Sequence, residues 1–373
     1  MKLILKKILL LSSAVLIIGI SISRETNLAK EITENVHYEQ SLVIQPTDVS
    51  DKEHRYNASA EVTAQNTVSQ PRPSWYISDD AIDIEKTPSA GRFCYSQMTA
   101  EQKHCYEKIR KAIEQHRTVL YWNDKCCTPS AIDTILMCIT YDYPEYFWYS
   151  DEYCYAVASV DNNEVAEKII LKYEYDKEEV YDMTEKIYYV VNEYLNSISH
   201  LKSDYDKALA GYEYIINNTR YDSIRAEYGY GSFGEMDKET MSCWNISGVF
   251  LHHNAICRGY VQAYQYLMNL QGIKCGYVYG DNHCWNVIQL DGDWYYTDIT
   301  WGDPVLKLTH QNEGYVEYIQ QGIDYSYFCM TTQQLLQLHT PDFDFNLELP
   351  VCTATKDNYF TRNPNSDKHN FFA

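Results

Sequence analysis

The sequence predicts an α+β protein in which one helix packs on an antiparallel sheet, with a smaller α+β domain in front of that core. Apolar residues at helical spacing follow Cys257, and two strand-like runs enclose the turn signal Asp291-Gly292. Helix-start signatures and further strand-like runs precede them in residues 91–202. Segments of both kinds together favour the α+β class.

A helix is expected to begin at Cys257. Val261, Tyr264 and Met268 recur at intervals that place them on one helical face, and Gly272 stands where the helix would end. A cysteine in the first turn of a helix meets the positive end of the helix dipole. That position lowers the pKa of a thiol and increases its thiolate fraction, as a nucleophile requires.

A β-hairpin is expected after this helix. Residues 284–290 and 294–299 have the composition of strands, and Asp291-Gly292 between them is the signature of a two-residue type I′ turn. Such a turn makes Leu290 face Asp293, and this pairing determines the register of the whole hairpin.

The register predicts a reactive site. It places Asp298 opposite Trp285 and His283 opposite Thr300, so that all four residues share one face of the hairpin. His283 and Asp298 are then diagonal neighbours, whereas a slip of one residue would separate them. Asp298 would hold the imidazole in one tautomer while His283 takes the proton of Cys257.

These segments resemble the core of the transglutaminase-like superfamily, whose relatives include papain-type cysteine proteases and peptide N-glycanases. The family pattern is carried by Cys257–Tyr260, Gly280–Asn286 and Trp294–Trp301. The resemblance implies a papain-like core and a catalytic triad of Cys257, His283 and Asp298.

The sequence departs from this family pattern at two places. Cys284 stands where alanine is more usual, and its side chain is expected to face away from the triad. Residues 252–255 replace a tighter glycine-containing turn.

A zinc site is the metal-binding alternative. His252, His253, Cys257 and His283 are its candidate ligands, but they lack the C-x-x-C or H-x-x-x-H spacing of common zinc sites. We therefore predict neither a metal nor a cofactor.

The composition indicates which partners the protein disfavours. Asp and Glu number 52 against 31 Lys and Arg, for a formal net charge of −21. Such a surface repels nucleic acids and anionic membranes. A protein or peptide substrate is the partner that the family resemblance implies.

The N-terminus is predicted to direct export. Three lysines in the first seven residues precede an apolar run, Ile8–Ile20, which is shorter than a full membrane span. Residues 1–23 are therefore predicted to be a signal peptide, with an uncleaved anchor as the alternative. The mature protein would be secreted or extracellular, with association at the cell surface as an alternative and no other membrane contact. Residues 24–90 are polar and aperiodic, which indicates a disordered spacer.

Residues 91–202 are predicted to form the smaller α+β domain. A capping box at Thr99 predicts the first helix of this domain. Packing or substrate selection is its implied role. Its other expected elements are helices at 132–138 and 185–197 and strands at 153–160 and 169–175.

Residues 203–373 are predicted to form the transglutaminase-like domain with a C-terminal extension. Ser203 opens a helix, which the family resemblance places beside the nucleophile helix. The glycine-rich stretch 223–243 is interpreted as a loop, either a lid or a plain connection. A strand at 325–330 and a short helix at 331–338 are expected to follow.

The twelve cysteines leave the disulfide pattern open. Export would permit disulfides. One hypothesis is that Cys257 is held in a disulfide until reduction releases it.

The predicted chemistry is acyl transfer through a thioester. An amine acceptor would make the protein a cross-linking transglutaminase, and water would make it a peptidase or deamidase. The backbone N–H of Cys257 would stabilise the oxyanion, with Trp244 or Tyr221 as the second donor. A non-catalytic cell-surface binding module is the alternative from another class.

Overall fold

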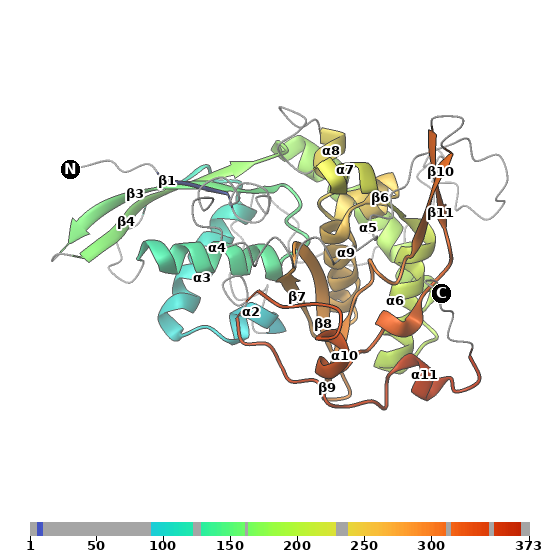
Figure 1. Cartoon of the computed structure of the whole chain (residues 1–373). Coiled ribbons are helices and arrows are strands. Elements are labelled where there is room, and N and C mark those ends of the chain that lie inside the picture. Colours follow the sequence, from blue (N-terminus) through green and yellow to red (C-terminus); the bar gives the residue numbers. More distant parts are fainter. Residues whose placement is uncertain are drawn as a thin grey trace, which may run out of the picture.

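The computed structural model describes residues 6–9, 91–121, 128–160, 163–228, 238–310, 315–342 and 347–366. It is a mixed helix and sheet structure, compatible with the predicted α+β class (Figure 1). The predicted spacer at 24–90, and the predicted signal peptide except for Lys6–Leu9, lie outside the described residues. Within the described ranges, no helix combines the length and the hydrophobicity needed to cross a membrane.

The three longer helices of the first half begin directly after a capping side chain. Thr99 forms the predicted capping box of α3. An unpredicted capping box at Asp176 starts α5 earlier than the expected 185–197, and α4 extends beyond the expected 132–138 at both ends. The helices here are α2 (Phe93–Ser96), α3 (Ala100–Glu114), α4 (Pro129–Asp142) and α5 (Lys177–Ser197).

A four-stranded antiparallel sheet belongs to the same half. Its order is β1-β3-β4-β2, and β3 and β4 form a long hairpin. The predicted strands at 153–160 and 169–175 lie within or largely within this hairpin. Its strands are β1 (Lys6–Leu9), β2 (Val119–Tyr121), β3 (Tyr149–Val160) and β4 (Asn163–Tyr173).

The second half is built around α9 (Cys257–Leu270), which starts at the predicted cysteine. Gly272 follows its C-terminus with φ of +75°, as expected of a glycine at a helix end. The helix predicted from Ser203 is α6, which packs along α9. The Tyr264 hydroxyl of α9 donates to the Ala208 carbonyl of α6 at 3.1 Å. The other helices are α6 (Asp204–Asn218), α7 (Ser223–Tyr228), α8 (Lys238–Ser242), α10 (Thr332–Leu335), α11 (Tyr359–Arg362) and a π-helix, Gly248–His252.

Two local predictions are wrong. The stretch 223–243 is not simply a loop, because α7 and α8 occupy its two ends. The strand expected at 325–330 is instead a 3-10 helix, Tyr325–Tyr327, which the Asp324 side chain caps. Cys329 then takes a left-handed φ of 58°, and Met330 forms an isolated bridge with Tyr296 of β9.

An antiparallel three-stranded sheet, β7-β8-β9, packs against α9. Leu290 pairs with Asp293, which confirms the predicted register. Asp291 and Gly292 both have positive φ, at 47° and 90°, as a type I′ turn requires. The strands are β7 (Cys275–Gly280), β8 (His283–Leu290) and β9 (Asp293–Thr297).

Two small sheets complete the described strands. A parallel pair, β5 (Arg220–Tyr221) and β6 (Asn254–Ala255), lies just before α9. An antiparallel hairpin follows β9 and was not predicted. Its strands are β10 (Val305–His310) and β11 (Tyr315–Gln320).

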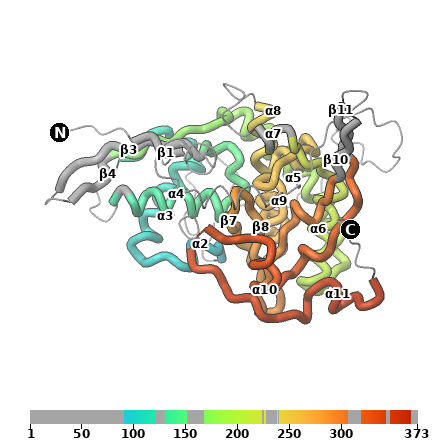
Figure 2. The backbone as a smooth tube through the Cα atoms, in the orientation of Figure 1, coloured from blue at the N-terminus to red at the C-terminus, as the bar shows by residue number. Residues whose placement is uncertain are grey.

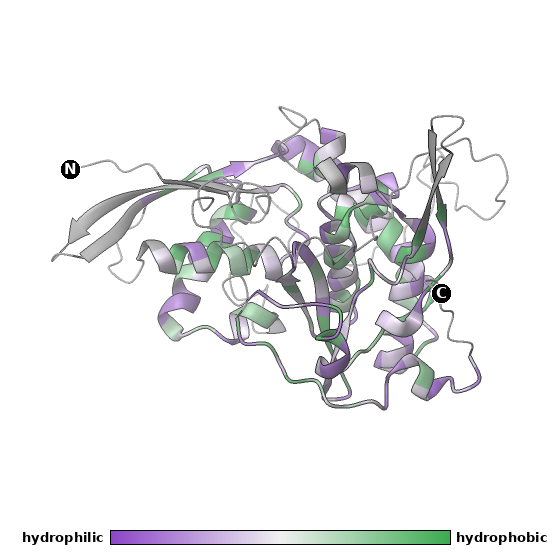
Figure 3. Ribbon diagram, in the orientation of Figure 1, coloured by the Kyte–Doolittle hydropathy of each residue, from purple (hydrophilic) through white to green (hydrophobic). Residues whose placement is uncertain are grey.

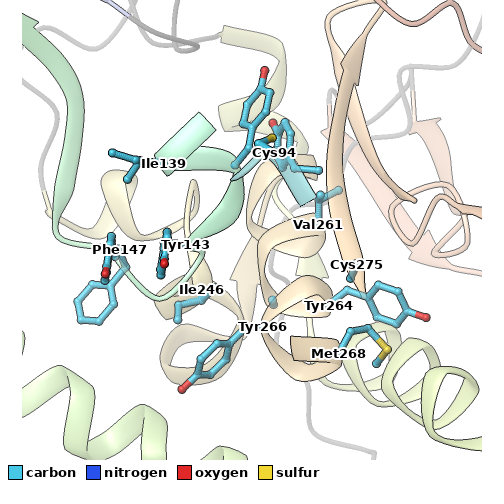
Figure 4. Packing of buried hydrophobic residues seen from close by; sticks show 14 of the residues in the cluster. Cys94, Ile139, Tyr143, Phe147, Ile246, Val261, Tyr264, Tyr266, Met268 and Cys275 are labelled. Atoms are coloured by element: carbon cyan, nitrogen blue, oxygen red, sulfur yellow. The ribbon is translucent and has the colours of Figure 1, made fainter. Parts of the chain in front are cut away.

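The three-stranded sheet separates two hydrophobic clusters. Cys284 and Ile288 of β8 face α9, where the predicted stripe Val261, Tyr264 and Met268 is fully buried (Figure 4). Trp285 and Val287 face the opposite cluster. In Figure 3, hydrophobic and hydrophilic residues alternate along the helices around the sheet, as expected of helices with one buried face.

The larger cluster includes residues from both predicted domains. Tyr141 of α4 stacks on Tyr277 of β7 with ring centroids 4.3 Å apart, and Gln265 of α9 donates to the Tyr141 carbonyl at 2.8 Å. Phe93 covers Gly276 so closely that a Cβ there would collide with its ring. A domain boundary at 202 stays a prediction, but the buried core passes across that position.

Candidate active site

Cys257 is the first residue of α9. Its thiol is free and partly buried. The preceding Ile256 is extended, and its side chain does not cap the backbone N–H groups at the start of the helix. Gly259 allows close packing here, because a Cβ would lie 2.8 Å from both the Ala255 Cβ and the Cys243 carbonyl oxygen.

His283 is the first residue of β8 and follows a second two-residue turn. Asp281 and Asn282 both have positive φ, at 51° and 57°, which closes the β7–β8 hairpin tightly. His283 lies on the same side of β8 as Trp285, and their ring centroids are 6.0 Å apart. Its ring also hydrogen-bonds the Cys257 thiol.

Asp298 directly follows β9 and is fully buried. Its Oδ1 accepts the backbone N–H groups of Thr300 and Trp301, both at 3.0 Å, so the turn after β9 orients the carboxylate. Its Oδ2 lies 2.8 Å from His283 Nε2. The structure thus brings together the pair that the hairpin register predicted.

The electrostatics favour an ion pair between sulfur and imidazole. Hydrogen bonds from Cys284 and His283 lower the pKa of Cys257 well below its ordinary value, although burial opposes them. Burial alone would lower the pKa of His283, but Asp298 and the Cys257 sulfur raise it to about 10. Burial would likewise raise the pKa of Asp298, yet the two histidines around it, His283 and His339, hold that pKa well below its usual range. The arrangement therefore favours a thiolate beside an imidazolium.

The expectation that Cys284 faces away from the triad is wrong. Its side chain does leave β8 on the side opposite to His283, but α9 begins against that side, and the two thiols form a hydrogen bond. Burial, followed by this contact, raises the pKa of Cys284 well above its ordinary value. Cys284 therefore stays protonated and serves as the donor.

Sequence reasoning missed His339. This residue follows α10 and is 3% exposed, with its Nε2 atom 2.9 Å from Asp298 Oδ2. Its ring stacks on Trp285 with centroids 4.6 Å apart and planes inclined by 16°. No motif or spacing in the sequence associates it with Cys257 or His283, since a chain segment that is remote in sequence delivers it.

The predicted zinc alternative is not assembled. Among the described residues, the group with suitable metal-ligand spacing is His283, Asp298 and His339, and it contains neither His252 nor His253. Its two N···O separations, 2.8 and 2.9 Å, are hydrogen-bond distances from one carboxylate oxygen. We therefore interpret the group as the His283–Asp298 pair of the triad with His339 beside it.

Tyr221 is the oxyanion-donor candidate that lies near the sulfur. It pairs with Ala255, two residues before Cys257, through β5 and β6. Burial, and then the charge of Cys257, raise the pKa of Tyr221 well above its ordinary value, so the hydroxyl remains a donor. Trp244 instead lines a small pocket that also includes Arg258 and contains no residue of the triad.

The comparisons with known proteins add little to this geometry. No family model matches the chain, and no curated protein matches it either. A solved structure described as a TGase aligns at 17% sequence identity with a TM-score of 0.29. The alignment covers 39% of this chain and 43% of that one, so the protein spans less than half the length of that structure. A similarity this weak carries no argument here.

Proposed function

We propose that the protein is a thiol-dependent acyltransferase with a transglutaminase-like, papain-like core that acts on protein or peptide carboxamides. The observation that carries the proposal is the position of His283. Its Nε2 lies 2.8 Å from the buried Asp298, while the same ring hydrogen-bonds the thiol at the start of α9. A nucleophile, a base and a residue that orients the base are then in contact.

The reaction follows from these contacts. The Cys257 thiolate attacks the carboxamide carbon, and the Cys257 N–H and the Tyr221 hydroxyl donate to the oxyanion. The His283 imidazolium gives its proton to the leaving amine or ammonia as the C–N bond breaks, which leaves a thioester. The neutral imidazole next takes a proton from the acceptor, which attacks the thioester and releases the thiol as thiolate.

The acceptor defines the enzyme class. A lysine amine yields an isopeptide cross-link between proteins, which is the outcome we propose. Water would yield peptidase or deamidase activity from the same thioester. Because the N-terminal segment is predicted to direct export, we place the substrate at the cell surface or outside the cell.

The first test measures the reactivity of Cys257 without any substrate. We expect iodoacetamide to alkylate Cys257 at pH 6 far faster than it alkylates the buried thiols, with mass spectrometry as the readout. His283→Ala should remove this advantage, since the imidazolium that stabilises the thiolate is gone. His200→Ala is the matched control, because His200 is exposed. If Cys257 alkylates as an ordinary thiol in the unmodified protein, the enzymatic proposal fails and a binding module is favoured.

The second test identifies the acceptor. Incorporation of a fluorescent primary amine into a glutamine-rich protein would indicate a transferase, whereas ammonia release without incorporation would indicate a deamidase. We expect Tyr221→Phe to lower the rate of either reaction by about 10²-fold, a typical loss for one oxyanion donor. Iodoacetamide alkylation should not change in this variant, because it forms no oxyanion. Unchanged turnover would assign the second donor elsewhere.

A further inference from the structure

The Asp298 carboxylate is approached by two imidazoles at a single oxygen. Oδ2 lies 2.8 Å from His283 Nε2 and 2.9 Å from His339 Nε2, while Oδ1 is occupied by two backbone N–H groups. Two backbone N–H groups therefore hold Oδ1, and the side chains of two histidines both lie next to Oδ2. Without His339, only the His283 side chain would remain at Oδ2.

The His339 ring is held in place by aromatic packing. It stacks on Trp285 and meets Trp301 nearly edge-on, with centroids 4.3 Å apart and planes at 64°. Its backbone N–H donates to the Leu335 carbonyl at 2.8 Å. A ring confined in this way has little freedom, so it can fix the position of a neighbour.

The chain around His339 is attached to the sheet at the same corner that carries His283. Pro341 bridges to Gly280, and the Asp342 N–H donates to the Tyr279 carbonyl at 3.0 Å. The Thr340 N–H donates to the Asp281 carboxylate, which belongs to the turn just before His283. Figure 2 shows the chain after β11 returning past β8. Both histidines are thus positioned from one corner of the sheet.

Packing alone does not account for a histidine at this position. A phenylalanine would fill the space between two tryptophans without burying a polar atom. The Nε2 atom of His339 is buried and has no well-aligned hydrogen bond, although it lies within 2.9 Å of the carboxylate. Burying such an atom costs free energy unless a charged neighbour compensates for it.

We propose that His339 is a positioning residue: its imidazole holds the Asp298 carboxylate in the orientation that His283 needs. This inference rests on the proposed function, since it concerns the same triad. His339 lies behind the carboxylate, so it stabilises the imidazolium only through Asp298. Loss of its Nε2 should therefore weaken the support for His283 and, through it, for the Cys257 thiolate.

The test compares His339→Phe, which keeps an aromatic ring, with His339→Gln, which keeps a hydrogen-bond donor. In His339→Phe, which preserves the stacking on Trp285, we expect the apparent pKa of Cys257 in iodoacetamide alkylation to rise by about one unit, a tenfold loss of thiolate at acidic pH. His339→Gln should retain more of the reactivity, because its amide can donate to Asp298, although its thermal stability should fall further. His200→Gln is the surface control and should match the unmodified protein.

A second measurement does not depend on the folding of these variants. Relative to the unmodified protein, the imidazole ¹⁵N resonances of both His283 and His339 should shift in Asp298→Asn. A response of His283 alone would overturn the inference.

Each remaining outcome has a separate meaning. A folded His339→Phe with an unchanged pH profile would overturn the inference while the proposed function stands. An ordinary thiol at Cys257 in the unmodified protein would end both. Stoichiometric binding of Zn²⁺ that is lost in His339→Phe would also overturn it, by making His283, Asp298 and His339 a metal site.

Discussion

The reactivity of Cys257 depends on which side chains reach its sulfur. Burial opposes ionisation, but the Cys284 thiol and the His283 ring both interact with the sulfur and lower its pKa. The start of α9 adds the positive end of the helix dipole. Cys284 therefore contacts the proposed nucleophile and favours its thiolate form.

Replacing Cys284 tests this role. Because the hydrogen bond from Cys284 favours the thiolate, Cys284→Ala should raise the pKa of Cys257. The thiolate is present above that pKa, so the loss of alkylation should be largest at acidic pH and small at alkaline pH. The measurement is the rate of iodoacetamide alkylation between pH 5 and pH 9.

Two matched variants accompany this measurement. Cys284→Ser retains a hydroxyl donor, so its pH profile should lie between those of the unmodified protein and Cys284→Ala. Cys275→Ala removes another buried thiol of the same sheet, whose pKa responds to burial and to Asn286 and not to Cys257, and should leave the profile unchanged. An identical profile for Cys284→Ala would show that the thiol contact has no effect on reactivity.

At the scale of elements, the site depends on the β7-β8-β9 sheet. Two tight turns, Asp281-Asn282 and Asp291-Gly292, have positive φ at all four positions. The second turn sets the register that brings Asp298 to His283, since one residue of slippage would move Asp298 to the other face. The first turn presents His283 at the corner of the sheet.

The turn at Gly292 should be sensitive to substitution. Gly292 has φ of +90°, a conformation that side chains disfavour, so Gly292→Val should lower the free energy of unfolding by about 1–2 kcal/mol. Urea unfolding measures the loss. Gly91→Val is the control, because a Cβ there meets nothing and its φ is not positive. Equal stabilities of the two variants would contradict this account of the turn.

At the scale of the molecule, the two halves share their buried surface. The buried Asp142 carboxylate of α4 accepts the backbone N–H groups of Cys94 and Tyr95 and the Tyr106 hydroxyl, all at 2.8 Å. This network fixes α2 and α3 to α4, and Tyr141 of the same helix packs on β7. The first half thus supports the sheet that carries His283.

Separating the halves should therefore prevent folding of the second. We expect residues 203–373 alone to lack a cooperative urea transition, because residues such as Tyr277 and Gln265 lose their partners in α4. Circular dichroism follows the transition, and residues 91–373 serve as the control that keeps both halves. A cooperative transition together with rapid Cys257 alkylation in 203–373 would instead establish an independent domain.

Local signals in the sequence predicted much of the core. The helix from Cys257 and the hairpin around Asp291-Gly292 were predictable because periodicity and turn residues act over a few positions. The residues at 325–330 have the composition of a strand, yet the Asp324 cap and the left-handed Cys329 produce a 3-10 helix instead. The composition of a segment does not reveal whether a neighbouring strand offers unpaired backbone N–H and C=O groups with which that segment could form a sheet.

The sequence by itself determined the order of Cys257, His283 and Asp298, the helix that begins at the first, and the register that joins the other two. Only the tertiary structure decided that Cys284 touches the nucleophile, that His339 reaches Asp298, and that the buried core crosses position 202. The physical reason is the separation along the chain over which each kind of interaction acts. Backbone geometry relates residues within a turn or a hairpin, whereas contacts between distant segments depend on how whole elements pack.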